Sequence, residues 1–203
     1  MFIKICGLRT ARDVDAAVAA GADAIGFVFA PSPRLVGAAE ARELAGRVPP
    51  HVLTVGVFRH QPLEEVASLA AAAGLRAVQL HGDEGPEYYT ALRDEGYTLL
   101  RATAPDAGRR ETCGALGEHM LLLDAPAPGS GRAWDWSDPR FVPPQGRWLL
   151  AGGLDAGNVG RAVRELSPWG VDVSSGVESA RGVKDTALIA EFVSAARAAH
   201  DAP

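Results

Sequence analysis

The stretches LLAGGLDAGNV (residues 149–159) and GVDVSSGVE (residues 170–178) decide how the rest of the chain is interpreted. Each is a short apolar run that breaks into small residues and then restarts as a helix, and glycines at such a crossing let backbone N–H groups approach an anion. In a (β/α)8 barrel the loops after the seventh and eighth strands commonly form a phosphate site. We therefore predict a phosphate site at Gly152, Gly153 and Gly176, although any one of these glycines alone could be an ordinary turn residue.

Eight strand-like runs alternate with helix-like runs along the whole chain. Such a βα alternation predicts a parallel sheet with right-handed crossovers, and eight units favour closure into a barrel. An open doubly wound sheet is the structural alternative, but no G-x-G-x-x-G motif follows the first strand-like run. The expected strands are residues 2–6, 23–30, 51–58, 75–82, 97–103, 119–124, 147–151 and 170–174.

The helices expected between these strands are uneven. Residues 105–117 have weak helical periodicity, and three prolines interrupt residues 137–146, so the fifth and sixth helices should be short or irregular. The fold class is therefore α/β, a single-domain TIM barrel of residues 1–203 with a shortened or irregular fifth and sixth helix region. Regular helices are expected at 10–20, 37–47, 62–74, 86–96 and 184–199.

With 203 residues, 47% hydrophobic and 22% charged, the composition is that of a soluble globular protein with one core. No apolar run approaches the ~20 residues that span a bilayer, and MFIKICG lacks the features of a signal peptide, so we expect a cytoplasmic protein without membrane association. The formal charge of −5, without clustered basic and aromatic residues, gives no footprint for nucleic acid. Cys6 and Cys113 are too few for a disulfide framework.

In this architecture the chemistry takes place where strands end and βα loops begin. Cys6 and Asp124 end the first and sixth expected strands and are our candidates for a base and an acid. A thiol near a helix N-terminus or a cation can lose its proton near neutral pH, whereas a carboxyl group removed from water can keep one. The alternatives are that Cys6 is a small apolar filler and that Asp124 caps a loop.

Other polar side chains lie at or after the remaining strand ends. Arg34, on a proline-stiffened loop, could bind a substrate carboxylate through two hydrogen bonds or form a surface salt bridge. His81 has no second His or Cys at metal-ligand spacing, so we expect a structural or substrate-binding role and no metal site. Residues 129–131 with Trp134 and Trp136 form either a lid or a packed surface loop. Further candidates at strand ends are Gln79, Asp172, Ser174 and Ser175.

A series of motifs, in their order and spacing, resembles the phosphoribosylanthranilate isomerases of tryptophan biosynthesis. The resemblance covers nearly the whole chain. One departure is that residues 128–131 read Pro-Gly-Ser-Gly where the family often has Gly-Gly-Thr-Gly, which bears on loop mobility more than on chemistry. The motifs are KICG (4–7), GFVFAPSPR (26–34), VQLHG (78–82), LLLD (121–124), GSGRAWDW (129–136), LAGGLDAGNV (150–159) and GVDVSSGVE with GVKD (170–185).

The resemblance implies an aldose-ketose isomerase that catalyses an Amadori rearrangement of N-(5-phosphoribosyl)anthranilate to 1-(2-carboxyphenylamino)-1-deoxyribulose 5-phosphate. It implies that Asp124 is the general acid for the ribose ring oxygen, that Cys6 is the general base for the C2 proton, and that Arg34 binds the anthranilate carboxylate. This chemistry requires no metal and no organic cofactor. We further expect substrate contacts at Gln79, His81 and Asp172 and phosphate contacts at Gly129, Gly131, Gly152, Gly153, Ser175 and Gly176.

Lys4 and Lys184 are the only lysines, so a Schiff-base mechanism has two candidates at most. If alternate residues of the first strand face inward, Lys4 lies one layer beneath Cys6. We expect it there to pair with Asp172 and to help hold the thiolate. Rival interpretations are an aldolase that uses Lys4, an epimerase, and a catalytically silent barrel that senses a phosphorylated ligand. We expect a small phosphosugar as the partner, and a monomer or homodimer.

Overall fold

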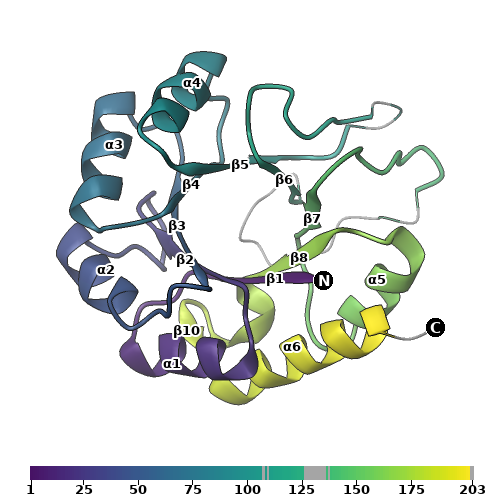
Figure 1. Cartoon of the computed structure of the whole chain (residues 1–203). Helices are drawn as coiled ribbons and strands as arrows, with labels where there is room; N and C mark the ends of the chain where they lie inside the picture. The colour runs from purple at the N-terminus through teal and green to yellow at the C-terminus, as the bar shows by residue number, and fades with distance from the viewer. Residues whose placement is uncertain (107, 109, 126–135, 137, 202–203) are drawn as a thin grey trace.

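Eight parallel strands close into a barrel in this computed structural model, which describes residues 1–106, 108, 110–125, 136 and 138–201 (Figure 1). Each strand pairs with its neighbours in chain order, and the first pairs with the last. The barrel predicted from the βα alternation is thereby confirmed. The strands are β1 Phe2–Cys6, β2 Ala24–Val28, β3 Leu53–Phe58, β4 Ala77–Leu80, β5 Thr98–Thr103, β6 Met120–Leu123, β7 Trp148–Leu150 and β8 Gly170–Val173.

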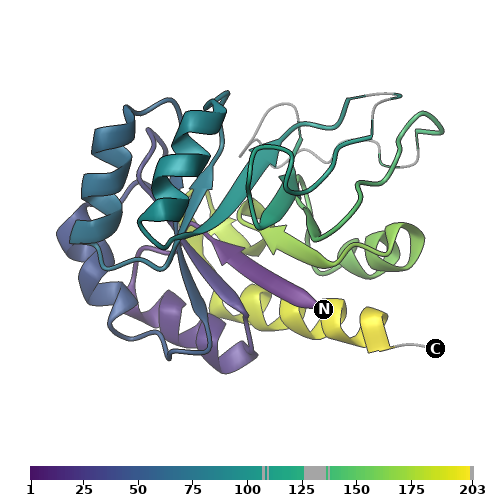
Figure 2. The ribbon, with the colours of Figure 1, turned by 45° about the horizontal axis from the view of Figure 1, so that its top comes forward.

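Helices surround most of the barrel, and in the part of the chain that the structure describes one side is left without them (Figures 1 and 2). The first helix begins where the Thr10 side chain accepts a hydrogen bond from the Asp13 N–H, and it ends at Gly21, whose φ of 90° is left-handed. Among the described residues no helix lies between β5 and β6 or between β6 and β7. The expected short or irregular fifth and sixth helix region is thereby confirmed. The helices are α1 Ala11–Ala20, α2 Ala38–Ala45, α3 Leu63–Ala72, α4 Pro86–Asp94, α5 Val159–Leu166 and α6 Thr186–Asp201.

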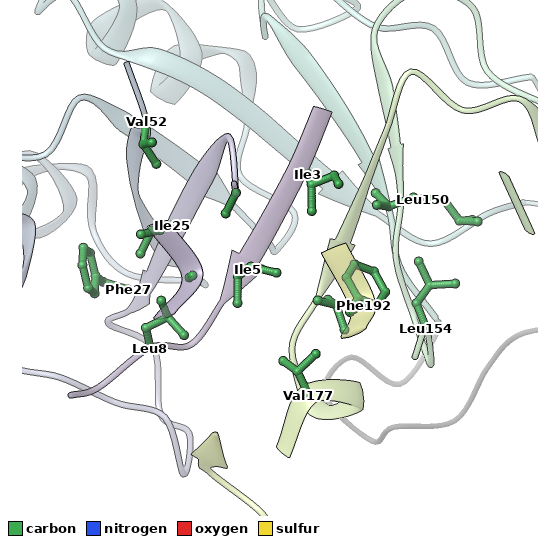
Figure 3. Packing of buried hydrophobic residues seen from close by; sticks show 14 of the residues in the cluster. Ile3, Ile5, Leu8, Ile25, Phe27, Val52, Leu150, Leu154, Val177 and Phe192 are labelled. Carbon is green, nitrogen blue, oxygen red and sulfur yellow. The ribbon is translucent and has the colours of Figure 1, made fainter. Parts of the chain in front are cut away.

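The strands bury apolar side chains on both faces, as parallel strands covered by helices should. Ile3 and Ile5 of β1 belong to the large cluster between the barrel and the helices, which also contains Phe192 of α6 (Figure 3). The alternate residues of β1, Lys4 and Cys6, point into the barrel, because successive side chains of a strand lie on opposite faces. The side-chain alternation expected for the first strand is therefore present.

A short 3-10 helix, Ser175–Val177, and a hairpin separate β8 from α6. The hairpin consists of β9, Glu178–Ala180, and β10, Val183–Lys184, and it turns at Gly182, whose φ is 80°. The last helix, expected at 184–199, is confirmed as α6, Thr186–Asp201, whereas the hairpin before it was not expected from the sequence. Glu178 and Lys184, on the two strands of the hairpin, form a buried ion pair.

No helix within the described part of the chain combines the length and the apolar composition needed to cross a membrane.

Candidate active site

A cavity of about 190 Å³ opens where the strands end and the βα loops meet. The six candidates Cys6, Arg34, Gln79, His81, Asp124 and Asp172 all lie in its wall, although they come from five different βα units. The topology therefore brings together the acid, base and substrate-binding residues predicted from the sequence. The remaining wall residues are Val28, Ala30, Pro31, Ser32, Pro33, Val57, Arg59, Ser174 and Arg181.

Lys4 lies in the barrel interior, two residues before Cys6 on β1, with 0% of its surface exposed. Its Nζ donates to Asp172 Oδ1 at 2.7 Å, so the predicted ion pair is confirmed. The two residues are direct partners in the β1–β8 register. Burial disfavours the ammonium, but the charges of Asp172 and Cys6 more than offset this, and the pKa of Lys4 lies above its usual value. Lys4 is therefore a fixed positive charge beneath the cavity.

Cys6 is a buried residue of the cavity wall, with 7% of its surface exposed. Burial raises the pKa of its thiol, and the Lys4 and Lys184 ammonium groups act in the opposite direction. The expectation of a thiol that loses its proton near neutral pH is wrong for the protein without substrate. The reason is that the free energy lost by removing a thiolate from water exceeds the free energy gained from its attraction to the two nearby cations.

Asp124 has the environment of a proton donor. Burial raises its pKa to about 6, against the opposing effect of a hydrogen bond that its Oδ1 accepts from the Ala125 N–H at 2.7 Å. Its Oδ2 lies 3.4 Å from His81 Nε2. A carboxyl group with this pKa holds a proton on about a tenth of the molecules at pH 7, far more than an exposed aspartate. The prediction that desolvation lifts the pKa of this carboxyl group is confirmed.

Gln79 and His81 carry polar atoms that the protein leaves unsatisfied. Gln79 Nε2 lies 3.2 Å from His81 Nδ1, and burial lowers the pKa of His81 to about 4, so the ring is neutral. Among the described residues, Gln79 Oε1 and His81 Nε2 are buried without a hydrogen-bond partner. Because such atoms are costly unless paired, they are suited to bind a ligand group in the cavity.

Arg34 is held by an internal carboxylate. Its Nε and Nη2 donate to the two oxygens of Glu178 at 2.6 and 2.9 Å, and the two side chains are only 7% and 4% exposed. The pair is thus not the surface salt bridge considered from the sequence. The sequence interpretation did not identify Glu178 as the partner of Arg34, and it considered Lys184 only as a Schiff-base candidate. Both stand inside the motifs quoted for the family resemblance, but no local pattern signals a partner 144 residues away.

The two glycine-containing crossings lie against each other. Gly152 and Gly153 have φ values of 85° and 70°, which favour glycine, and a Cβ added to Gly176 would lie 1.8 Å from the carbonyl oxygen of Leu154. Within the described ranges the N–H groups of Gly153 and Gly176 find no protein acceptor. The geometry thus leaves donors near Ser175 for a phosphate, which is the site that the two sequence stretches predict.

Replacing Gly176 by Ala is expected to push the two crossings apart, because the new methyl group would overlap backbone rather than a movable side chain. We expect competitive inhibition by inorganic phosphate to weaken at least about tenfold, with a stability loss of about 1–3 kcal/mol. The matched control is Gly37→Ala, where an added Cβ meets nothing within 4 Å. Unchanged phosphate inhibition in Gly176→Ala would contradict a phosphate site at these crossings.

Part of the predicted site lies outside the described residues, namely Gly129, Gly131 and Trp134. Trp136 is described and is 5% exposed, with the guanidinium of Arg161 over its ring at 5.5 Å from the centroid. The lid therefore stays a prediction. In the described part of the chain, no group of three or more His, Cys, Asp or Glu residues is placed to hold a metal ion.

The family model and the curated relatives give one consistent family. The model of the N-(5'phosphoribosyl)anthranilate (PRA) isomerase family matches residues 3–195. The N-(5'-phosphoribosyl)anthranilate isomerase of Dechloromonas aromatica is 44% identical over 206 residues, covering 98% of this chain and 97% of that protein. The crystal structure of TrpF from Jonesia denitrificans is 46% identical with a TM-score of 0.89, covering 99% and 98% of the two chains.

A phosphoribosyl anthranilate isomerase solved in complex with reduced 1-(o-carboxyphenylamino)-1-deoxyribulose 5-phosphate is 32% identical to this chain, with a TM-score of 0.80. The match covers 98% of this chain and 99% of that chain. The similarity therefore extends over the complete barrel, including every element that lines the cavity.

Proposed function

The chain belongs to the N-(5'-phosphoribosyl)anthranilate isomerase family, and we propose that it performs the family's reaction with Cys6 as general base and Asp124 as general acid. The reaction is an aldose-ketose isomerisation, an Amadori rearrangement, in tryptophan biosynthesis. The observation that carries these roles is that a buried thiol and a carboxyl group with a pKa of about 6 line one cavity. Such a pair can move two protons in opposite directions.

In the first step Asp124 donates its proton to the ribose ring oxygen while the bond between C1 and that oxygen breaks. The nitrogen lone pair forms the new C1–N double bond, which leaves an iminium. In the second step Cys6 takes the proton from C2, and the electron pair of that C–H bond forms the C1–C2 double bond. The π electrons of the C1–N double bond return to nitrogen, which gives a neutral enolamine. Loss of the proton from the C2 hydroxyl and protonation at C1 then give the ketose.

The general base, Cys6, must lose its proton in a site where burial disfavours the thiolate. Lys4 and Lys184 favour the ionised form of Cys6, although burial outweighs them in the free protein. The iminium that forms next to C2 adds a further positive charge at the moment when the base is required. We infer that the thiolate is stabilised mainly in the reacting complex, which is where charge stabilisation accelerates a reaction.

Substrate placement follows from the groups left unpaired around the cavity. The phosphate would bind the free N–H groups of the glycine crossings, and the anthranilate carboxylate would bind the part of the Arg34 guanidinium that Glu178 does not occupy. Gln79 Oε1 and His81 Nε2 would pair with substrate polar groups, as would the oxygen of Asp172 that Lys4 does not hold. The phosphate ligands would be Gly129, Gly131, Gly152, Gly153, Ser175 and Gly176.

The rival Schiff-base aldolase is disfavoured by the burial of both lysines. Lys4 has no exposed surface and donates to Asp172, and the side chain of Lys184 is 1% exposed and donates to Glu178. A nucleophilic amine must be neutral and must reach the substrate carbonyl. We further propose that the chain acts in the cytoplasm on a small phosphosugar, without nucleic acid, as a monomer or a homodimer.

Turnover of freshly made phosphoribosylanthranilate, followed by its change in fluorescence, tests the proposed function. We expect rapid conversion to the ketose by the unaltered protein, without added metal or cofactor. Addition of borohydride during turnover should trap no covalent adduct on Lys4 or Lys184. Binding of the substrate without turnover would instead favour the silent sensor, and a trapped lysine adduct would favour the aldolase.

Plotted against pH, kcat/KM should rise at low pH, stay constant over a plateau and fall at high pH. The reaction requires protonated Asp124, with a pKa of about 6, and ionised Cys6, with a pKa above its ordinary value. Below about pH 6 the rate rises with pH because the thiolate fraction grows while Asp124 stays protonated. Between the two pKa values the gain in thiolate cancels the loss of acid, and above both the rate falls.

The substrate phosphate also titrates near pH ~6 and must be separated from Asp124. The inhibition constant of the reduced product ligand, measured over the same pH range, removes that contribution. A corrected kcat/KM that declines steadily from pH 6 to 9 would contradict the proposed pairing of acid and base.

A further inference from the structure

The guanidinium of Arg34 has one side occupied and one side open. Glu178 takes the side formed by Nε and Nη2, through two hydrogen bonds of 2.6 and 2.9 Å. Nη1 has no hydrogen-bond partner within the described residues, and Arg34 lines the cavity. The end formed by Nη1 and the second hydrogen of Nη2 is therefore the part that can bind a carboxylate through two parallel hydrogen bonds.

Glu178 is fully engaged as an ionised group. Besides Arg34 it accepts hydrogen bonds from Lys184 Nζ at 2.8 Å and from the Gly182 N–H at 3.0 Å. Burial disfavours the carboxylate, but these four hydrogen bonds and the Lys184 charge lower the pKa of Glu178 to about 2. It therefore keeps its charge at every pH at which the enzyme works, and it compensates one of the two neighbouring positive charges.

The hairpin that carries Glu178 is packed on the loop that carries Arg34. A Cβ added at Gly182 would lie 2.9 Å from the carbonyl oxygen of Pro33, so the hairpin turn touches the backbone next to Arg34. Lys184 also donates to the backbone oxygen of Ser174 at 2.7 Å, which ties the hairpin to the end of β8. The position of Glu178 is thus fixed independently of Arg34.

From this arrangement we infer that Glu178 is a positioning residue for substrate selection. It holds the Arg34 guanidinium so that only the Nη1–Nη2 end faces the cavity, and it thereby sets the place and direction of the substrate's ring carboxylate. The inference rests on the proposed role of Arg34 as the carboxylate ligand. It adds that discrimination for a carboxylated ring depends on a buried acidic residue which does not itself touch the substrate.

Two ligands that differ only in the ring carboxylate test this role. One is reduced 1-(o-carboxyphenylamino)-1-deoxyribulose 5-phosphate, and the other is the same reduced compound with a plain phenylamino group. In the unaltered protein we expect the carboxylated ligand to bind about 10–100 times more tightly, the range for a charged hydrogen-bonded pair. In Glu178→Gln we expect this preference to fall at least about tenfold, while the plain ligand binds within about threefold of its original affinity.

The steady-state constants provide a second readout. Because the carboxylate is held in the ground state and in the transition state alike, Glu178→Gln should raise KM with little change in kcat. Glu178→Asp keeps the charge with a shorter reach and should restore part of the preference. The matched control is Asp15→Asn, which removes another carboxylate that holds an arginine, Arg47, on the exposed surface. It should leave both ligands unaffected.

Arg34→Met separates failure of this inference from failure of the proposed function. If Arg34→Met abolishes the preference and Glu178→Gln leaves it intact, Arg34 keeps its role and the positioning role of Glu178 is wrong. If Glu178→Gln weakens both ligands equally, Glu178 serves only the structure, and the inference is also overturned. If the unaltered protein shows no preference, the role proposed for Arg34 fails and the inference fails with it.

Discussion

Asp124→Asn and Cys6→Ser should each lower kcat by about 10³-fold, within the range of 10²–10⁴ for loss of a general acid or base. Asparagine has nearly the shape of aspartate but no proton to give to the ring oxygen. Serine is close in size to cysteine, but its hydroxyl is far too weak an acid to exist as the anion. Both variants should keep the fold, because neither residue makes a buried ion pair of its own.

Single-turnover and steady-state measurements of substrate fluorescence give the rate constants, and binding of the reduced product ligand shows whether the site is intact. Matched controls are Cys113→Ser, which alters the other free thiol, and Asp138→Asn, which alters an aspartate paired with Arg140 away from the cavity. Both controls should retain full activity. If either active-site variant keeps more than a tenth of the original kcat, the corresponding acid or base must be another residue.

Lys4→Met should produce the largest loss of stability of any single substitution considered for this chain. It leaves Asp172, which is 8% exposed, without its ion-pair partner in the barrel interior. Removing one partner of a buried pair typically costs about 3–5 kcal/mol, because the remaining charge is uncompensated. Unfolding in urea, followed by circular dichroism, would measure the change in free energy.

The double variant Lys4→Met with Asp172→Asn serves as the control for that experiment. It removes both charges and should recover much of the lost stability. The rate at which Cys6 reacts with a thiol reagent, measured against pH, checks a separate consequence, since loss of the Lys4 charge should raise the pKa of the thiol further. Equal stability of the single and double variants would show that the uncompensated charge of Asp172 is not the cause of the loss. An unchanged thiol titration would show that Lys4 does not affect the ionisation of Cys6.

The barrel was predictable because its signals are local. Short apolar runs, glycine ends and proline interruptions recur along the chain, and the order of the strands follows from the handedness of βα units. Strand ends were less predictable. Residues 23–30 read as one strand, yet β2 ends at Val28, and Phe29 and Ala30 are buried in the loop that follows it. Apolar character therefore marks burial, and it does not distinguish a strand from the loop that follows it.

The candidate site was predictable only as far as strand ends could be located. Cys6 and Asp124 were found in this way, and the partner of Lys4 followed from side-chain alternation. The protonation of Cys6 was not predictable, because it depends on how deeply the loops bury the thiol. The ion pair between Arg34 and Glu178 was also not predictable. It joins the loop after β2 to the hairpin after β8, and only the closed barrel brings these two segments together.

The Lys4–Asp172 pair also constrains the order in which the molecule can be assembled. Its members are 168 residues apart, on the first and last strands of the barrel. While the chain is being synthesised, β1 emerges with an ammonium group that has no counter-charge until β8 has been made. An N-terminal fragment that buried Lys4 would pay the full desolvation penalty, so such fragments should remain open. Pairing of β1 with β8 then completes the core and neutralises the Lys4 charge in a single late event. This favours all-or-none folding.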